Sequence, residues 1–394
     1  MGKNGSYPYI DEFGNMHEEK DIYFTDVDLY EGFSKPSDWG ITDEKQRFPN
    51  VFTKKIVPLD KRGFPTAVRS KINGKIADIK VDENGRRLPI HAGSCEQINA
   101  IYFALPSTGK TTFYLTTLMS EKYLNALAYV NFSLSIVEDV SERNGAQLQY
   151  RRKLEEFERE KKLPGNTLKG QVIMFPYYVE SKTKNILLCV KDTSGEDCLK
   201  FNWTAPEIIN NKYFFVMISA EDILMDRYNY SEIISRLIQS LNLHRKDKDY
   251  EILVIITKSD LLYADSYFRE NEVENSIDYK NGKIEFTTHA WGFNMKQFKA
   301  KEDIIKDYLD YKCPNLMNKL RTVKKMHFFM IASLGYSTSD NYYDQELCMP
   351  FSTDEPWTYI LYKEGVYPGM TNISLKEKVM EAFERLVGYD VDEE

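Results

Sequence analysis

The stretch INAIYFALPSTGKTTFYLTTLM, residues 98–119, decides how the rest of the chain is interpreted. An apolar run typical of a buried strand ends at Leu105, and a second apolar segment with helical character opens just after Gly109. A strand, a short loop and a helix in this order put the loop at the carboxyl end of the strand. Open α/β sheets bind their ligands at that edge. The stretch therefore predicts a ligand site between residues 105 and 110.

The loop of this stretch, ALPSTGKT at 104–111, follows the phosphate-binding pattern Gly-x-x-x-x-Gly-Lys-Ser/Thr, with Ala in place of the first Gly. In that pattern, backbone N–H groups and the positive end of a helix surround a phosphate, the Lys adds a point charge, and the next hydroxyl ligates Mg²⁺. The pattern by itself is also compatible with an ordinary helix start. The residues expected to contact a bound nucleotide here are Ser107, Thr108, Gly109, Lys110, Thr111 and Thr112.

A second polar cluster ends the apolar strand in KNILLCVKDTSGED, residues 184–197. Asp192, at the end of this strand, can reach a Mg²⁺ ion beside the phosphate loop, and Gly195 can offer its backbone N–H to a γ-phosphate. Taken alone, an Asp and a Gly at a strand end also form an ordinary turn. The cluster supports a nucleotide site only in combination with the phosphate loop.

A third cluster ends the apolar strand in EILVIITKSDLL, residues 251–262, with Thr257, Lys258 and Asp260. A carboxylate in the plane of a purine accepts hydrogen bonds from N1–H and the 2-amino group of guanine, donors that adenine lacks. The aliphatic stem of a lysine can lie along the base. Read in isolation, this cluster is equally a solvated strand end followed by a helix start.

A fourth polar turn follows the apolar strand in HFFMIASLGY, residues 327–336. A backbone N–H near Ser333 or Leu334 is expected to meet O6 of guanine. Each of the four clusters has an ordinary explanation, but their joint occurrence at the carboxyl ends of four apolar strands predicts one nucleotide site along a sheet edge.

Composition narrows the class of protein. A net charge of −8 over 394 residues opposes non-specific binding of nucleic acid, which needs a basic field. The 5 cysteines include no Cys-x-x-Cys pair, which argues against a zinc site and a disulfide framework. The N-terminus has no apolar core of a signal peptide, and the longest apolar runs are strand-sized. We therefore expect a cytoplasmic protein without a membrane span.

The chain divides by pattern into two parts. Residues 1–95 are polar and rich in turn signals, and predict a small, mostly β or irregular module. Residues 96–394 alternate apolar strands with helices, which predicts an α/β domain: a mainly parallel sheet with helices on both faces. Within it we expect an insertion near 125–165, with a charged helix at 146–162, and a C-terminal helical extension at 350–394.

Together the four clusters resemble the P-loop GTPases of the translation-factor and Ras-like class, and residues 96–365 look most like the bacterial double-GTPase family. The resemblance implies that Lys110 contacts the β- and γ-phosphates and that Thr111 and Asp192 bind Mg²⁺. It also implies that Lys258 and Asp260 read guanine. Thr167 matches the position of the switch threonine, which ligates the metal. Glu196 stands where Ras-like enzymes have a water-positioning Gln, which implies hydrolysis that is slow, partner-dependent or carried by another residue.

The implied function is Mg²⁺-dependent hydrolysis of GTP to GDP, coupled to a conformational switch that acts on a protein effector encoded nearby. Relatives of this kind occur in multi-gene bacterial conflict and signalling systems. Two alternatives stay open: a scaffold that holds GTP or GDP with negligible hydrolysis, and an ATP-using P-loop enzyme. The pattern also leaves open a homodimer formed across the nucleotide.

Overall fold

The structure is a computed structural model. It describes residues 7–11, 13–18, 21–25, 67–69, 74–82, 86–118, 127, 130–134, 146–165, 172–200, 208–225, 227, 229–246, 249–267, 279–280, 283–284, 292–336, 341–348 and 350–369. Thr167 and residues 370–394 of the expected C-terminal extension lie outside the described residues.

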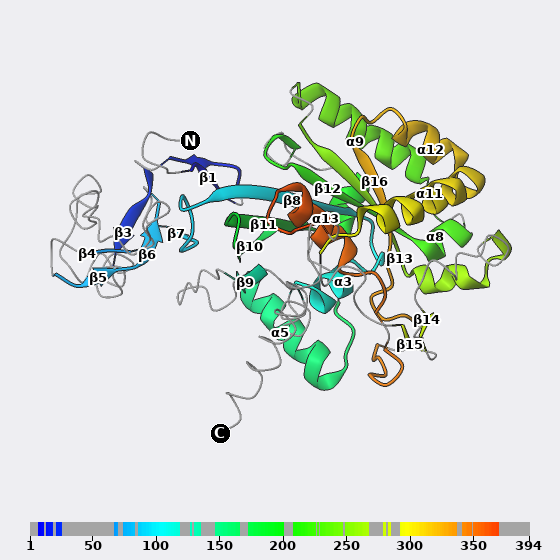
Figure 1. Cartoon of the computed structure of the whole chain (residues 1–394), viewed down its shortest axis with the longest axis horizontal. Helices are drawn as coiled ribbons and strands as arrows, with labels where there is room; N and C mark the ends of the chain where they lie inside the picture. The colour runs from blue at the N-terminus through cyan, green and yellow to red at the C-terminus, as the bar shows by residue number, and fades with distance from the viewer. Residues whose placement is uncertain are drawn as a thin grey trace.

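A seven-stranded sheet forms the centre of the molecule (Figure 1). Its order is β16-β13-β12-β8-β11-β10-β9. Strand β10 runs antiparallel to both of its neighbours, and the other pairings are parallel. The strands are β8 (Glu96–Ala104), β9 (Val130–Leu134), β10 (Val172–Ser181), β11 (Ile186–Thr193), β12 (Tyr213–Ser219), β13 (Glu251–Thr257) and β16 (Met326–Met330).

The inner strands are apolar because helices cover both faces of the sheet. Every residue of β11, β12 and β13 is buried, as expected for parallel strands covered on both sides. Successive side chains of β12 enter different cores: Phe215 belongs to one hydrophobic cluster and Phe214 to the other. The mainly parallel sheet with helices on both faces, predicted from the sequence, is confirmed.

The first of these cores contains residues of α3 (Lys110–Thr116), α5 (Ala146–Glu160) and α13 (Glu355–Lys363). The second contains residues of α9 (Tyr230–His244), α11 (Met295–Lys312) and α12 (Pro314–Leu320). The shorter elements are α6 (Gly195–Lys200), α8 (Ala220–Met225), η3 (Ser259–Ala264) and the small pair β14 (Tyr279–Lys280) and β15 (Lys283–Ile284). Within the described residues, no helix is both long and apolar enough to cross a membrane.

Strand β9 falls in the segment expected as an insertion, and it extends the main sheet at one edge. The charged helix expected at 146–162 is α5, which ends at Glu160. In the segment expected as a C-terminal extension, α13 is packed into the core, and Trp357 is fully buried against Phe113 and Phe215. Sequence patterns did not indicate either β9 or the central position of α13, because both depend on contacts with distant parts of the chain.

The N-terminal part consists of short antiparallel strands. They are β1 (Tyr9–Ile10) with β2 (Met16–His17), β3 (Tyr23–Thr25) with β6 (Ile79–Val81) and β7 (Arg87–Leu88), and β4 (Val68–Arg69) with β5 (Ile76–Ala77). Their apolar residues form a cluster together with Leu187 and Cys189 of β11. Backbone groups of Ile10 also exchange hydrogen bonds of 2.7 and 2.8 Å with the Gln97 amide at the start of β8. The N-terminal strands therefore pack on the main sheet.

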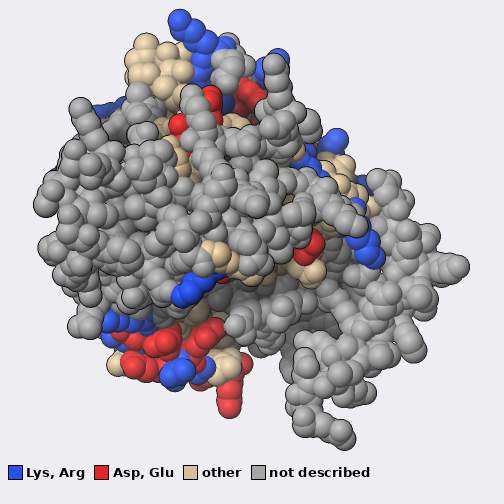
Figure 2. Space-filling model, turned by 90° about the vertical axis from the view of Figure 1, so that its left-hand side faces the viewer, with Lys and Arg blue, Asp and Glu red and all other residues tan. Residues whose placement is uncertain are grey.

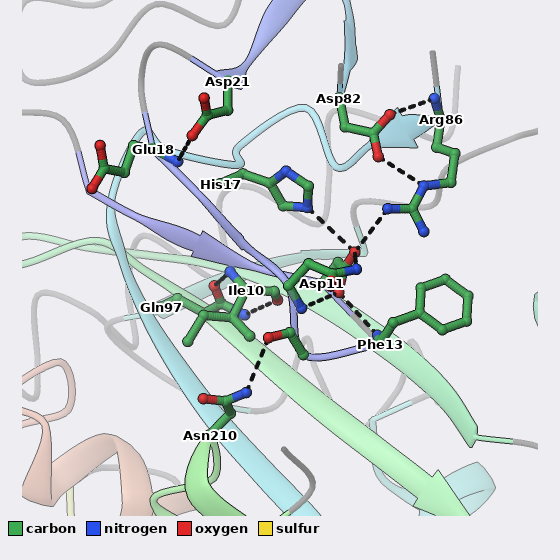
Figure 3. Close-up of polar contacts among 12 residues, drawn as sticks. Ile10, Asp11, Phe13, His17, Glu18, Asp21, Asp82, Arg86, Gln97 and Asn210 are labelled. Atoms are coloured by element: carbon green, nitrogen blue, oxygen red, sulfur yellow. Dashed lines mark hydrogen bonds and ion pairs between the residues drawn. The ribbon is translucent and has the colours of Figure 1, made fainter. Parts of the chain in front are cut away.

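One buried carboxylate organises the turn between β1 and β2 (Figure 3). Asp11 accepts hydrogen bonds from the backbone N–H groups of Phe13, at 3.0 Å, and Asn15, at 2.8 Å. Its side chain also lies 3.3 Å from His17 Nε2 and 3.3 Å from a guanidinium nitrogen of Arg86. Burial opposes ionisation, but the hydrogen bonds from His17 and Asn15 lower the pKa of Asp11 to about 2. The turn is thus held by a fully paired charge.

Candidate functional site

The loop between β8 and α3 turns through two left-handed residues. Ser107 has φ 65° and Gly109 has φ 81°, and Gly109 immediately precedes the first residue of α3. A positive φ is readily adopted by Gly and uncommon for Ser. The Thr108 hydroxyl donates to the Leu105 carbonyl at 3.0 Å, which closes the loop on itself. This tight turn brings Lys110 to the carboxyl end of β8.

Lys110 and Asp192 meet at this edge of the sheet. The Lys110 ammonium donates to the Asp192 carboxylate and to the Thr193 carbonyl, and the side chains of Lys110 and Asp192 are only 8% and 3% exposed. The Thr193 hydroxyl in turn donates to the Tyr102 carbonyl of β8 at 2.9 Å. Burial raises the pKa of Asp192, and the Lys110 ammonium partly offsets that shift. Each charge needs the other, because an isolated buried charge is costly.

Gly195 lies directly against the phosphate loop. A Cβ atom built on Gly195 would be 2.6 Å from the backbone nitrogen of Pro106 and 2.8 Å from the carbonyl carbon of Leu105. Side-chain carbons do not approach backbone atoms so closely, so only Gly fits at this position. The backbone at Gly195 is therefore in direct contact with the loop after β8.

The end of β13 is joined to the same loop. The Thr257 hydroxyl donates to the Thr108 carbonyl at 2.5 Å. The next residue, Lys258, has φ 52°, an uncommon conformation that turns the chain into η3. Asp260 lies in η3 and is partly buried. Burial raises the pKa of Asp260, while its own backbone N–H and the Lys258 ammonium oppose the shift.

An acidic residue of α8 forms an ion pair with Lys258. Its ammonium donates to Glu221 Oε2 at 2.9 Å. Glu221 also accepts a hydrogen bond of 2.9 Å from Arg227. The hydrogen bond from Lys258 lowers the pKa of Glu221, with a smaller contribution from Arg227 and with burial acting against the shift. The carboxyl end of β12 thus fixes the direction of the Lys258 side chain.

The fourth predicted cluster lies beside the third. The backbone N–H of Ser259 donates to the Ile331 carbonyl at 3.1 Å, which joins the end of β13 to the end of β16. The Ala332 N–H is already used by the Phe351 carbonyl, at 3.1 Å. Ser333 and Leu334 follow in a half-buried bend next to this bridge. The four strand ends therefore meet along one edge, as expected for neighbouring parallel strands.

One described residue among those predicted, Glu196, does not join this arrangement: its side chain is exposed to solvent, and its backbone N–H donates to Ser194 Oγ at 3.2 Å. Thr167 lies outside the described residues. The remaining residues of the predicted phosphate loop, Thr111 and Thr112, begin α3, with Thr111 buried and Thr112 half-buried.

Two oxygen-bearing side chains at this edge are of the kind that binds Mg²⁺ together with a phosphate. Among the described residues, no group of three or more His, Cys, Asp or Glu side chains could hold a metal ion. Mg²⁺ is usually held by one or two carboxylates together with substrate phosphates and water. Asp192, which contacts Lys110, and Thr111, which follows Lys110 in α3, are the residues that would hold such an ion.

Glu221 was not predicted from the sequence. It is an acidic residue in the first turn of a helix, a pattern typical of a solvated helix surface.

The sequence matches no protein-family model, and no curated protein matches it.

Proposed function

We propose that this chain is a P-loop GTPase: a Mg²⁺-dependent guanine-nucleotide-binding protein that hydrolyses GTP and switches a protein partner. The observation that carries the proposal is the 2.5 Å hydrogen bond from the Thr257 hydroxyl to the Thr108 carbonyl. It joins the loop with phosphate-binding character to the strand end that bears Lys258 and Asp260. One elongated ligand can therefore contact both.

The phosphate end of the proposed site is supported by the paired charges of Lys110 and Asp192. In the proposed complex, Lys110 contacts the β- and γ-phosphates, while Asp192 and Thr111 hold Mg²⁺. The metal neutralises charge that develops on the phosphate oxygens. Gly195, whose backbone touches the loop, offers its N–H to the γ-phosphate.

The environment of the Asp260 carboxylate supports the part of the proposed site that would bind the nucleotide base. Burial raises the pKa of this partly buried carboxylate, and its own backbone N–H and the Lys258 charge oppose that shift. Guanine supplies two donors, N1–H and the 2-amino group, that would satisfy it; adenine supplies neither in that place. The Asp260 environment therefore favours guanine over adenine.

The direct test is to identify the nucleotide that co-purifies with the chain by mass spectrometry. GDP or GTP is expected; ATP or ADP would contradict the guanine assignment. Single-turnover release of phosphate from bound GTP then separates an enzyme from a scaffold. Release no faster than in buffer would favour the scaffold, a result that the exposed carboxylate of Glu196 makes worth testing.

A switch on a partner requires a segment whose order depends on the γ-phosphate. The segments next to Thr167 and after Gly195 are the ones that we assign to this role. Limited proteolysis with GDP and with a non-hydrolysable GTP analogue tests the assignment. Equal cleavage in both states would contradict it.

A further inference from the structure

Two serine hydroxyls at the candidate site are buried without a hydrogen-bond partner. Ser219 is the last residue of β12, and Ser259 follows Lys258 at the end of β13; they are 1% and 0% exposed. Within the part of the chain that the structure describes, neither Oγ atom has a hydrogen-bond partner. Such a group destabilises the folded state, because it has lost its bonds to water and gained none. Buried hydroxyls of this kind are rare in native proteins and call for an explanation.

The register of the sheet places Ser219 next to a residue that supports the phosphate loop. Ser219 pairs with Thr257 of the neighbouring parallel strand. Paired residues of such strands have their side chains on the same face, here the face on which Phe215 and Met217 join the core shared with α3. On this face the Thr257 hydroxyl donates to the Thr108 carbonyl at 2.5 Å. Ser219 and Thr257 therefore offer neighbouring hydroxyls to one loop.

The other neighbour of β12 gives the same position. Strand β12 also pairs with β8, where Met217 lies opposite Ala104, the last residue of β8. Because β12 continues for two residues beyond this pair, Ser219 lies past the end of β8, where the phosphate loop begins. The register does not place the Ser259 hydroxyl in this way, so the inference is confined to Ser219.

The loop conformation of this structure satisfies one of the two neighbouring hydroxyls. The Thr257 hydroxyl has the Thr108 carbonyl as its acceptor, whereas the Ser219 hydroxyl has no partner among the described residues. Binding of a phosphate turns backbone N–H groups of such a loop toward the anion. A change in these backbone groups is therefore the event that would give the Ser219 hydroxyl a partner.

Charged side chains on the face shown in Figure 2 do not point to a different ligand site. The described Lys and Arg side chains at its lower end lie among Asp and Glu side chains. A mixture of both signs creates little field to attract a charged ligand. The two buried hydroxyls, in contrast, lie at the ends of β12 and β13, at the sheet edge of the proposed nucleotide site.

We propose that Ser219 is a positioning residue of the phosphate loop, whose hydroxyl bonds to the loop backbone only when the phosphates of a nucleotide are bound. The empty chain contains an unsatisfied hydroxyl and the complex does not. This difference favours the phosphate-bound form of the loop over the empty form. The inference rests on the proposed function, because it requires a phosphate in the loop.

The test measures stability and affinity in the same full-length variants. Ser219→Ala removes the unsatisfied hydroxyl, so the thermal midpoint of the chain freed of nucleotide with EDTA should rise by about 1–3 °C. Its affinity for GDP with Mg²⁺, measured by calorimetry, should fall by about two- to tenfold, the value of one neutral hydrogen bond. A merely structural role would move stability and affinity in the same direction.

Three further variants complete the comparison. Thr257→Val removes a hydroxyl that already bonds to the loop, so both the thermal midpoint and the GDP affinity should fall. Ser219→Cys fills the same place with a weaker hydrogen-bonding group and should lose affinity as Ser219→Ala does. Ser235→Ala removes a hydroxyl of α9 that donates to the Ser231 carbonyl at 2.6 Å, and should leave GDP affinity unchanged.

The outcomes that overturn the inference differ from those that overturn the proposed function. Unchanged GDP affinity in Ser219→Ala, or a lower thermal midpoint of this variant without nucleotide, would overturn the role of Ser219 and leave the proposed function intact. Full affinity in Ser219→Cys would do the same, because packing and not a hydrogen bond would then explain the loss in Ser219→Ala. Absence of GDP binding by the unmodified chain would overturn the proposed function, and this inference with it.

Discussion

Gly195 and Pro106 touch through their backbones: a Cβ atom on Gly195 would lie 2.6 Å from the Pro106 nitrogen. These residues come from segments that are far apart in the sequence, and their contact brings the end of β11 against the loop after β8. The contact leaves no room for any side chain at position 195. It also makes the geometry of the proposed γ-phosphate site sensitive to a single methyl group.

Gly195→Ala is therefore expected to separate these two segments and to weaken binding of the GTP analogue. Overpacking of this kind typically costs about 1–3 kcal/mol, which corresponds to a loss of about 5- to 150-fold if all of it falls on binding. Calorimetry measures the affinity. Lys200→Ala, a change of an exposed residue in the same helix α6, is the control. Unchanged affinity in Gly195→Ala would contradict the close approach.

Asp260→Asn tests which base the site reads. The amide cannot accept from both guanine donors, so GTP affinity should fall by about 100-fold or more while the weak affinity for ATP stays the same. Competition of each nucleotide against a fluorescent GDP derivative measures both affinities. Asp265→Asn is the matched control, because Asp265 forms an ion pair of 2.8 Å with Lys312. An equal loss for GTP and ATP would contradict base recognition by Asp260.

Glu221→Gln removes the charge that orients Lys258. Partly exposed ion pairs contribute about 0.2–1 kcal/mol, so GDP affinity should fall by no more than about fivefold. Lys258→Met keeps the stem and should behave alike, whereas Lys258→Ala removes the stem expected along the base and should lose more. Fluorescence titration with GDP measures all three. If Lys258→Ala binds GDP as tightly as Lys258→Met, the stem does not contact the base.

His17 makes the stability of the N-terminal strands depend on pH. The hydrogen bond with Asp11 raises the pKa of His17 above its usual value of 6.5, against the effect of burial, and the charges of Asp82 and Arg86 act in opposite directions. A raised pKa in the folded state contributes stability that is fully present below pH 6.5 and is lost as the pH rises through the raised value.

Urea unfolding of the unmodified chain and of His17→Gln at pH 5.5 and pH 8.5 tests this dependence. The variant is expected to be less stable by about 1–2 kcal/mol at the lower pH, and the difference should shrink at the higher pH. His244→Gln, at an exposed helix end, should show no such trend. A difference that grows with pH would contradict the sign of the shift.

The sequence predicted well those features that depend on neighbouring residues. The apolar runs that became β8, β11, β12 and β13 are local, because a buried parallel strand needs apolar residues at every position. The loop before α3 is also local, since its Gly and Lys define a turn and a charge within a few residues. The composition of residues 146–162 predicted where the charged helix α5 begins, and predicted its end to within two residues.

What the sequence alone determined about this protein is thus a set of strands and helices, with polar residues at four strand ends. Only the tertiary structure decided that β9 extends the sheet, that α13 is buried against α3, and that Gly195 touches Pro106. The physical reason is that periodicity reports which face of an element is apolar. It does not report which distant element will cover that face, because many pairings bury similar apolar area.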